Sequence, residues 1–317
     1  MYTNPPLEVK ENLRLLTEDL DNKIPAKQLD RNLLIASWNI RAFGDLTRKW
    51  ASDEKDTPKR DMHAILCIAE ILRRFDVIAV QEVKSNLRSL RDTLKILGPE
   101  WSMILTDVTK GKAGNAERMA YIFDTRRLNL SGLAGELVIP DEWLKQTGKD
   151  ALKKQFVRTP YAVSFRSKNQ TFILVTLHVL YGSKAEERIP ELKEIARWLS
   201  EWSKDVNAYH HNLIVMGDFN IEARGDLLDQ TFLSEGLFVP EALQNKSITR
   251  SIFDETKYYD QIAWFNGEKG EPRLSLEFKT GGNYDFTTIA MKNRGLSRQR
   301  LSFMLSDHYP LWTEFKL

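Results

Sequence analysis

The sequence predicts an α+β fold in which two mixed sheets pack together and helices cover their outer faces. In parts of the chain, strand-length apolar runs alternate with amphipathic helices, as in parallel strand connections. From residue 101 to 137, short strands instead follow one another with no helix between them, as antiparallel strands do. We find no internal repeat and no linker rich in Gly, Ser or Pro, so residues 31–317 are expected to form one domain after an N-terminal helical extension, 1–30.

The first hundred residues predict three helices and two buried strands. Leucines at helical spacing predict the helix of the extension: Leu13, Leu16 and Leu20. Apolar runs predict buried strands at 33–39 and 76–82. A helix is expected at 57–75, with Thr57 as N-cap and Pro58 in the first helical position. Another is expected at 85–98, with Ser85 as N-cap and Gly98 just beyond its end.

The same patterns continue to the end of the chain. Strands are predicted at 101–105, 118–123, 128–139, 171–179, 212–218, 258–265 and 309–315. Helices are predicted at 141–155 and 184–202, and a turn at 266–270.

Composition excludes several classes of protein. The net charge is only +2, which is below the strongly basic balance of a typical nucleic-acid-binding domain. The single cysteine, Cys67, allows no intrachain disulfide and lies in an apolar helical segment, where a buried thiol is expected. No signal peptide and no membrane-length apolar run is found, so we expect a cytoplasmic protein without a membrane span. Nothing in the sequence indicates an obligatory protein partner.

Polar residues recur at the ends of the predicted core strands. Four apolar runs end in a polar residue: Asn39, Glu82, His178 and Asp218, with Asn220 two positions later. Two late strands begin with such residues instead: Asp260, and the pair Asp307 and His308. If the last two strands run antiparallel to the first four, all these groups converge at one end of the sheets. Each residue alone has an ordinary structural explanation; their repetition predicts a site.

The residue types in this set favour metal-assisted phosphoryl transfer. Carboxylates and amides are hard oxygen ligands, which suit Mg²⁺ or Mn²⁺ rather than zinc. The two histidines can exchange protons near neutral pH. Such a set can stabilise charge on a phosphate, activate water and protonate a leaving oxygen.

Short motifs, in a fixed order along the chain, support the same functional interpretation. They are SWNIRAFG, QEV, AERMAYIF, FVRTP, TLH, GDFN, YDQI and SDHYP, and they span roughly residues 33 to 317. The chain resembles the endonuclease/exonuclease/phosphatase superfamily, and is most similar to its deoxyribonuclease I-like branch.

The resemblance implies a four-layer αββα sandwich and assigns roles to the residues that match. Glu82 would be the main Mg²⁺ ligand, with Asn39 and Asp307 beside it. The other assignments are that His308 pairs with Asp260, that His178 pairs with Glu117, that Asp218 and Asn220 position phosphate, water or a second metal, and that Arg158 contacts the phosphate. Which histidine is the acid and which the base stays open, as does the number of metals.

The resemblance implies a Mg²⁺-dependent phosphodiesterase, and we expect a DNA endonuclease of low sequence specificity. The same chemistry on RNA, an inositol phosphate or a sphingomyelin-like lipid is the alternative, and a catalytically inactive binding protein is a further one. Deoxyribonuclease I reads the minor groove with an arginine and a tyrosine at positions held here by Lys84 and Asn115. The basic run Lys292, Arg294, Arg298 and Arg300 fits either a nucleic-acid contact or a solvated loop.

Overall fold

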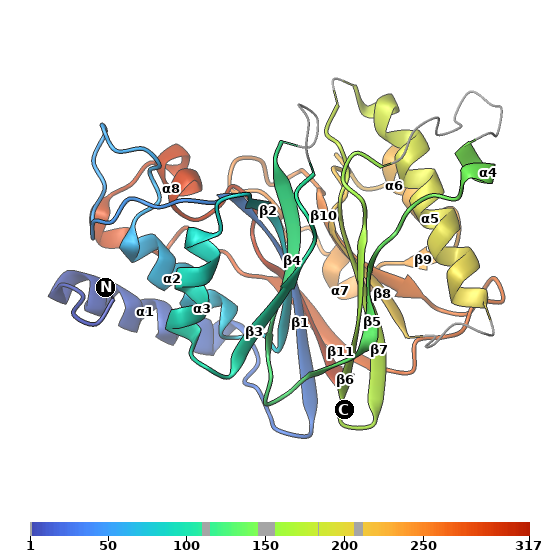
Figure 1. Ribbon diagram of the computed structural model, residues 1–317, viewed down its shortest axis with the longest axis horizontal. Helices are drawn as coiled ribbons and strands as arrows, with labels where there is room; N and C mark the ends of the chain where they lie inside the picture. The colour runs from blue at the N-terminus through green and yellow to red at the C-terminus, as the bar shows by residue number, and fades with distance from the viewer. Residues whose placement is uncertain (1, 110–114, 145–155, 183, 206–211) are drawn as a thin grey trace.

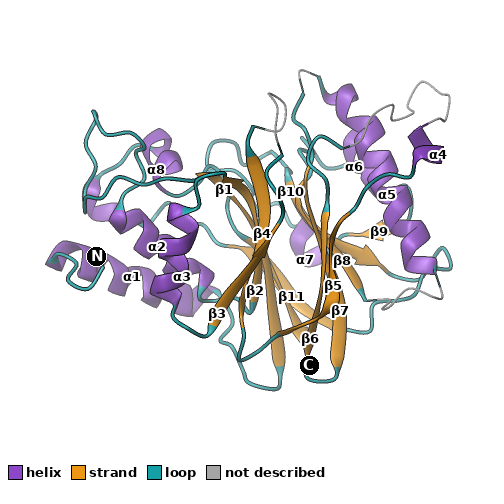
Figure 2. Ribbon diagram, in the orientation of Figure 1, coloured by secondary structure: helices purple, strands orange, loops and turns teal. Residues whose placement is uncertain are grey.

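Two six-stranded sheets face each other, and helices cover the outer side of each sheet (Figure 1, Figure 2). The computed structural model describes residues 2–109, 115–144, 156–182, 184–205 and 212–317. The expected fold class, a four-layer αββα sandwich of two mixed sheets, is confirmed.

The first sheet has the strand order β11-β12-β1-β2-β4-β3. Its strands are β1 (Asn32–Phe43), β2 (Val77–Lys84), β3 (Trp101–Leu105), β4 (Glu117–Asp124), β11 (Glu277–Asn283) and β12 (Leu311–Lys316). The second sheet has the order β5-β6-β7-β8-β10-β9. Its strands are β5 (Asn129–Glu136), β6 (Tyr161–Ser167), β7 (Gln170–His178), β8 (Leu213–Asp218), β9 (Leu237–Phe238) and β10 (Asp260–Phe265).

The helices lie in two groups. One group, on the first sheet's side, comprises α1 (Leu7–Lys23), α2 (Met62–Leu72), α3 (Arg88–Leu97) and α8 (Arg298–Met304) (Figure 1). The other group includes α5 (Ile189–Lys204) and α6 (Leu227–Leu233), with the short α4 (Asp141–Leu144) and α7 (Glu241–Gln244). Two 3₁₀ turns, η1 (Ala185–Arg188) and η2 (Lys292–Arg294), complete the described elements.

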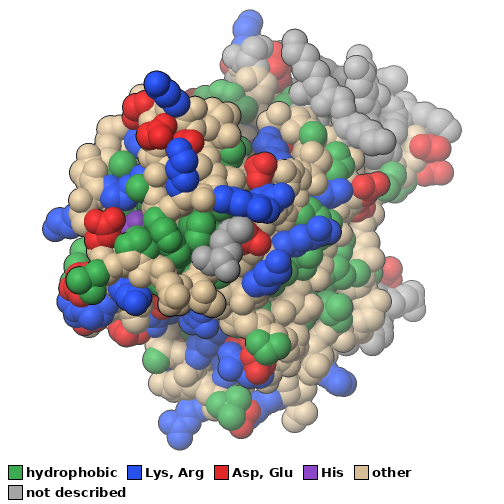
Figure 3. Space-filling model, turned by 60° about the vertical axis from the view of Figure 1, so that its left-hand side comes forward, with side chains coloured by type: hydrophobic (Ala, Val, Ile, Leu, Met, Phe, Trp, Pro, Cys, Tyr) green, Lys and Arg blue, Asp and Glu red, His purple; other side chains and the backbone are tan. Residues whose placement is uncertain are grey.

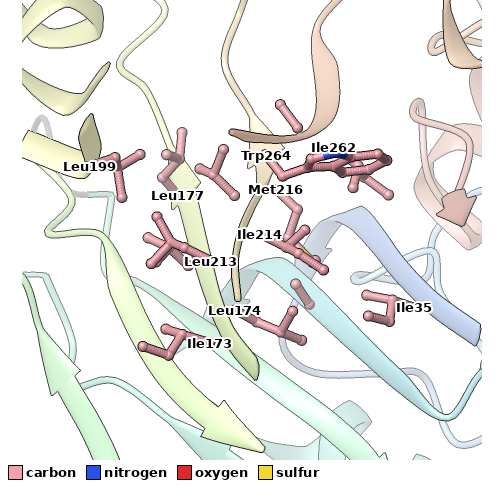
Figure 4. Packing of buried hydrophobic residues seen from close by; sticks show 14 of the residues in the cluster. Ile35, Ile173, Leu174, Leu177, Leu199, Leu213, Ile214, Met216, Ile262 and Trp264 are labelled. Atoms are coloured by element: carbon pink, nitrogen blue, oxygen red, sulfur yellow. The ribbon is translucent and has the colours of Figure 1, made fainter. Parts of the chain in front are cut away.

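Strand β1 shows how the sequence builds both core layers. Its side chains alternate between faces, so Leu33 and Ile35 join the core shared with the second sheet, whereas Leu34 and Trp38 pack under the helices of the first. Figure 4 shows the shared core, with Ile35 on one side and Leu199 of α5 on the other. Because both faces of β1 are buried, its first half carries an uninterrupted apolar run, residues 33–36, instead of alternating apolar and polar side chains.

Strand directions bring the predicted polar ends together. Strand β1 is parallel to β2, and β7 is parallel to β8, so these four strands end on one side of the sandwich. Strand β12 is antiparallel to β1, and β10 is antiparallel to β8, so both begin on that side. We call this side the upper end of the sandwich, as it lies in Figure 1.

Several predicted boundaries are wrong. Helix α2 begins at Met62 with Asp61 as its N-cap, whose carboxylate accepts a hydrogen bond from Ala64 N at 3.0 Å, and Thr57 and Pro58 lie in the preceding loop. Helix α3 begins at Arg88, and Leu87 takes the cap position without a side-chain bond, so Ser85 is not its cap. The predicted helix at 141–155 is present as α4 up to residue 144, and its remainder lies outside the described residues.

Other elements follow the predictions or were not predicted. The turn at 266–270 is confirmed, with positive φ at Gly267 and Gly270. Seven described elements were not predicted: β6, β9, β11, α6, α7, α8 and η2.

Helix α1 packs against the first sheet's helices through a buried polar contact. Asn12 Oδ1 accepts hydrogen bonds from His63 Nε2 at 3.0 Å and Met291 N at 2.9 Å, and Asn12 Nδ2 donates to Ile289 O at 2.9 Å. Leu16 and Leu20 lie in the same core cluster as α2. The N-terminal helix and residues 31–317 therefore share a packed interface.

Two surface properties complete the description. Lys and Arg side chains are interspersed with Asp and Glu on the face shown in Figure 3, in keeping with the small net charge. Among the described residues, no helix has the length and apolarity needed to cross a bilayer.

Candidate active site

The registers of three strand pairs place the predicted residues at the upper end. His178 of β7 lies beside Asp218 of β8, and Asp218 lies beside Asp260 of β10. In the first sheet, Glu117 of β4 lies beside Lys84 of β2. The two sheets are also linked directly, because Asn39 Nδ2 donates to Asp218 Oδ2 at 2.9 Å.

His308 is held between two carboxylates. Its Nδ1 lies 2.7 Å from Asp260 Oδ2, and its Nε2 lies 3.9 Å from Asp218 Oδ2. Burial disfavours the imidazolium, but the negative charges of Asp260 and Asp218 outweigh burial and raise the pKa of His308 well above its usual value. These carboxylates therefore favour the protonated, cationic form of His308.

His178 has the opposite electrostatic environment. Its Nε2 lies 3.6 Å from Asp218 Oδ2 and its Nδ1 lies 3.5 Å from Glu117 Oε2. Burial lowers the pKa of His178 well below its usual value, and the positive charges of Arg158 and His308 lower it further. The site thus places an imidazole with a lowered pKa and one with a raised pKa on either side of Asp218, which suits the two rings to opposite roles in proton transfer.

Burial raises the pKa of Asp218 itself to about 6, although the charge of His308 opposes the shift. Asn220, two residues later, anchors this loop. Its backbone N donates to Asp218 Oδ1 at 2.9 Å and its Nδ2 donates to Val179 O at 2.7 Å. Its side chain thereby joins the ends of β7 and β8.

Glu117 is the centre of a cationic cluster. Its Oε1 accepts hydrogen bonds from Lys84 Nζ at 2.8 Å and from Asn115 Nδ2 at 2.6 Å. Its Oε2 lies 2.7 Å from Arg158 Nε, although neither atom has a partner in hydrogen-bonding geometry. Lys84 and Asn115, which occupy the groove-reading positions of deoxyribonuclease I, are thus turned toward a carboxylate of their own chain.

Three side chains form a candidate cation site. Glu82 Oε2 accepts a hydrogen bond from Ala42 N at 2.8 Å, and Asp307 Oδ2 lies 3.7 Å from Arg41 Nη1. Burial raises the pKa of Glu82, and the nearby carboxylates of Glu117 and Asp307 raise it further. Asn39 Oδ1 is buried without a hydrogen-bond partner. A bound cation would relieve the repulsion and satisfy that oxygen.

This set fits Mg²⁺ better than a metal that needs a complete cage of protein ligands. Among the described residues, no cluster of three or more His, Cys, Asp or Glu side chains is arranged to hold a metal ion. Mg²⁺ keeps several waters and is commonly bound by one or two carboxylates together with substrate phosphate. Glu82 and Asp307, with the amide oxygen of Asn39, meet that smaller requirement.

Backbone strain is concentrated at this end of the sandwich. Five of the eight non-glycine residues with positive φ among those described lie here: Ala42, Glu82, Asn115, Ala116 and Asn220. Such conformations cost energy and persist where the surrounding structure imposes them, commonly at functional sites. The positive φ of Glu82 and Asn220 therefore indicates that they belong to a functional site, independently of their side-chain chemistry.

Three buried arginines, which sequence reasoning missed, hold the loops of the site. Arg60 donates to the carbonyl oxygens of Arg41, Ala42, Met304 and Leu305. Arg188 donates to Tyr181 O and Asn220 O, and Arg250 donates to Asp260 O and to two further carbonyls. No local sequence signal distinguishes them from surface arginines, because their partners are carbonyls distant in sequence.

The basic run at 292–300 is largely engaged within the chain. Arg294 Nη1 lies 2.6 Å from Asp61 Oδ2, and Arg300 Nη2 donates to Asp53 O at 2.9 Å. Arg298 Nη1 donates to Ile252 O at 3.2 Å. These three side chains hold the structure around α8, which differs from both alternatives, a nucleic-acid contact and a solvated loop. Cys67 is buried, as expected.

Comparisons with known proteins agree with the geometry. A sequence model described as the Endonuclease/Exonuclease/phosphatase family matches residues 36–249. A deoxyribonuclease of Thioalkalivibrio sp. (strain K90mix) is 31% identical over 296 residues, covering 90% of this chain and 71% of that protein. Deoxyribonuclease-1 of Bos taurus is 26% identical over 204 residues, covering 62% of this chain and 63% of that protein.

Among solved structures, a mannosyl-6-phosphatase of Bacteroides thetaiotaomicron VPI-5482 is similar to this chain with a TM-score of 0.58 and 19% identity. The match covers 89% of this chain and 99% of that one. At this identity the likeness concerns the fold alone.

Proposed function

The chain belongs to the endonuclease/exonuclease/phosphatase family and is a hydrolase, and we propose that it is a Mg²⁺-dependent phosphodiesterase that cuts DNA internally with little sequence preference. One observation carries the proposal. The Nε2 atoms of His178 and His308 lie 3.6 and 3.9 Å from the same oxygen, Asp218 Oδ2, beside an unpartnered Asn39 Oδ1. This arrangement fits attack by water on a phosphate held between the two histidines.

In this proposal Glu82, Asn39 and Asp307 hold the ion. When bound, Mg²⁺ supplies positive charge that stabilises the negative charge of the phosphate oxygens. His308, held cationic by Asp260, donates a hydrogen bond to the phosphate. Asp218 orients the attacking water between the imidazoles.

The cluster around Glu117 completes the proposed site. Glu117 fixes Arg158 and faces the Nδ1 edge of neutral His178, so its charge organises both. Arg158 then supplies a fixed positive charge near the phosphate. The position of the bound substrate decides which histidine protonates the leaving oxygen. The Nε2 atoms of His178 and His308 lie 3.6 and 3.9 Å from Asp218 Oδ2.

DNA as substrate is supported by the two deoxyribonucleases at 31% and 26% identity. The alternative is another phosphoester, because the description of the matching family includes phosphatases as well as nucleases. RNA, an inositol phosphate and a sphingomyelin-like lipid therefore belong in any substrate panel.

The direct test is relaxation of supercoiled plasmid by the purified chain with Mg²⁺ or Mn²⁺. We expect nicking by the wild type, strong loss in His178→Ala and His308→Ala, and an unchanged rate in Glu277→Ala, a control at the exposed Lys316–Glu277 pair. Intact plasmid in both metals, or equal nicking by all four proteins, would contradict the proposal. Turnover of another panel member with DNA untouched would support the alternative.

A further inference from the structure

An exposed aromatic pair lies beside the proposed catalytic histidines and has no role in the chemistry described above. Tyr181 follows His178 by three residues and is 51% exposed, which is unusual for a large ring next to a buried site. Tyr259 directly precedes Asp260 and is half-buried. The chain thus places one tyrosine after the β7 strand end and another before the β10 strand start.

The two rings form a continuous wall that ends at His308. The Tyr259 ring centroid lies 5.6 Å from the His308 ring at an interplanar angle of 34°. The Tyr181 ring packs edge-on against Tyr259, with centroids 6.5 Å apart. A group stacked on this wall would therefore lie within one nucleotide of a phosphate bound at His308.

Buried contacts hold the wall in place. The Arg188 guanidinium, which is 2% exposed, lies 4.3 Å from the Tyr181 ring centroid. Its Nε donates to Tyr181 O at 2.5 Å and its Nη1 donates to Asn220 O at 2.8 Å. The next residue, Gly182, has φ +67°, a left-handed conformation that favours glycine in the turn that presents Tyr181. The ring is thus fixed to the same loop that carries Asn220.

Beyond the wall, Glu222 pairs with buried Arg188 and with Lys257, and Lys257 belongs to a group of cations around a cavity. Arg188 Nη1 lies 3.0 Å from Glu222 Oε1, and Lys257 Nζ lies 3.5 Å from Glu222 Oε2. Lys257 lines a cavity of about 420 Å³ with two other cations, Arg224 and Lys246, and one acid, Glu255. Aromatic rings for bases beside cations for the next phosphates are the pattern of single-strand binding.

On the side of Glu117, two described side chains, those of Lys84 and Asn115, are engaged within the chain and are not free to read a duplex groove. Lys84 and Asn115 both donate to Glu117 Oε1. A paired base in duplex DNA is covered by its neighbours on both faces and presents only its edges. The wall can therefore accept a base only where the strand is unpaired.

Building on the proposed function, we propose that Tyr181 and Tyr259 stack an unpaired nucleobase next to the scissile phosphate. The substrate is then single-stranded nucleic acid or an unpaired stretch of a duplex. Supercoiled plasmid, in which strand separation is favoured, is cut faster than the relaxed circle.

The test compares three 12-residue substrates: oligothymidylate, the same strand in a duplex, and a tetrahydrofuran chain that keeps the phosphodiesters but lacks bases. Oligouridylate in parallel separates DNA from RNA. The variants are Tyr181→Ala and Tyr181→Phe. Phe238→Ala serves as control, because Phe238 is an exposed aromatic on β9, 37% exposed, outside the site.

We expect Tyr181→Ala to lower kcat/KM on oligothymidylate roughly 5- to 150-fold, mainly through KM, and to leave the baseless chain unaffected. Tyr181→Phe and Phe238→Ala keep wild-type values. Equal loss on both chains, no loss on either, or a wild-type preference for duplex overturns the inference and leaves the proposed function intact. A wild type that cuts none of the substrates overturns both.

Discussion

The two ends of the β-sandwich both bury charged side chains, but they treat these charges differently. At the lower end, buried Asp76 accepts hydrogen bonds from Leu34 N at 2.8 Å and Arg127 Nε at 2.9 Å. Buried Glu314 accepts from Asn32 Nδ2 and Lys279 Nζ, both at 2.9 Å. Each carboxylate at this end is matched by a cation and by donors.

At the upper end, several buried polar atoms, including carboxylate oxygens, have no hydrogen-bond partner. Buried atoms without a hydrogen-bond partner include Asn39 Oδ1, Glu117 Oε2, His178 Nδ1 and Asp260 Oδ1. The pKa of both Glu82 and Asp218 is raised, first by burial. Unsatisfied buried groups lower stability, so their concentration at one end indicates function there and structure at the other. The contrast predicts that substitutions at the two ends change different properties.

The largest expected effect is on turnover at the upper end. Asp218→Asn should lower kcat on plasmid by about 10²–10⁴-fold, because it removes the charge between the two imidazoles. The unfolding free energy, measured in urea, should stay the same or rise, since a buried carboxylate is replaced by a neutral amide. If the unfolding free energy of Asp218→Asn fell together with its kcat, the proposed difference between the two ends would be contradicted.

The lower end should show the reverse. Asp76→Ala leaves Arg127 buried without its partner and should lower the unfolding free energy by about 3–5 kcal/mol. Its turnover per folded molecule should equal that of the wild type. Glu277→Ala, which breaks the exposed Lys316–Glu277 pair, is the matched control and should cost less than about 1 kcal/mol. A specific activity that falls with Asp76→Ala would show that the two ends are coupled.

A third prediction concerns His63, far from the site. Burial lowers its pKa to about 4, whereas the unfolded imidazole titrates near 6.5. Between these values the unfolded chain binds the extra proton, so stability is complete above pH 6.5 or so and falls as the pH drops toward about 4, by roughly 3 kcal/mol in all. His63→Gln should flatten this part of the profile. Identical pH profiles of the two proteins would contradict the buried, neutral state.

The smallest expected effect is on metal-free stability. Without divalent ions, Glu82→Gln should be more stable than the wild type by about 1 kcal/mol, since it removes a charge repelled by Glu117 and Asp307. Thermal unfolding in EDTA measures this difference. A clearly less stable variant would mean that Glu82 has a structural role instead.

The sequence predicted the fold where apolar patterns are strong. Strands β1, β2, β7 and β8 are continuous apolar runs, and the fold class and family drawn from the motifs are confirmed. Strand β11 was not predicted because its sequence, EFKTGGN, is charged and glycine-rich. It is held by pairing with β12, and Gly282 lies against the Trp312 ring, a contact that only the tertiary structure reveals.

The site divides in the same way. The polar strand ends could be listed from the sequence because their neighbours are apolar, and the structure brings them together. The contacts of Arg60, Arg188 and Arg250 could not be, because their carbonyl partners come from other segments. The turning of Lys84 toward Glu117 depends likewise on the register of β2 and β4.

The central claim is that Glu82, Asp307 and the unpartnered oxygen of Asn39 hold a cation that phosphodiester cleavage requires. Calorimetric titration of Mg²⁺ into the wild type and into Glu82→Gln tests it most directly. We predict saturable binding to the wild type and its loss in the variant, together with the loss of plasmid nicking. Absence of binding to the folded wild type, or equal binding to both proteins, would contradict the claim.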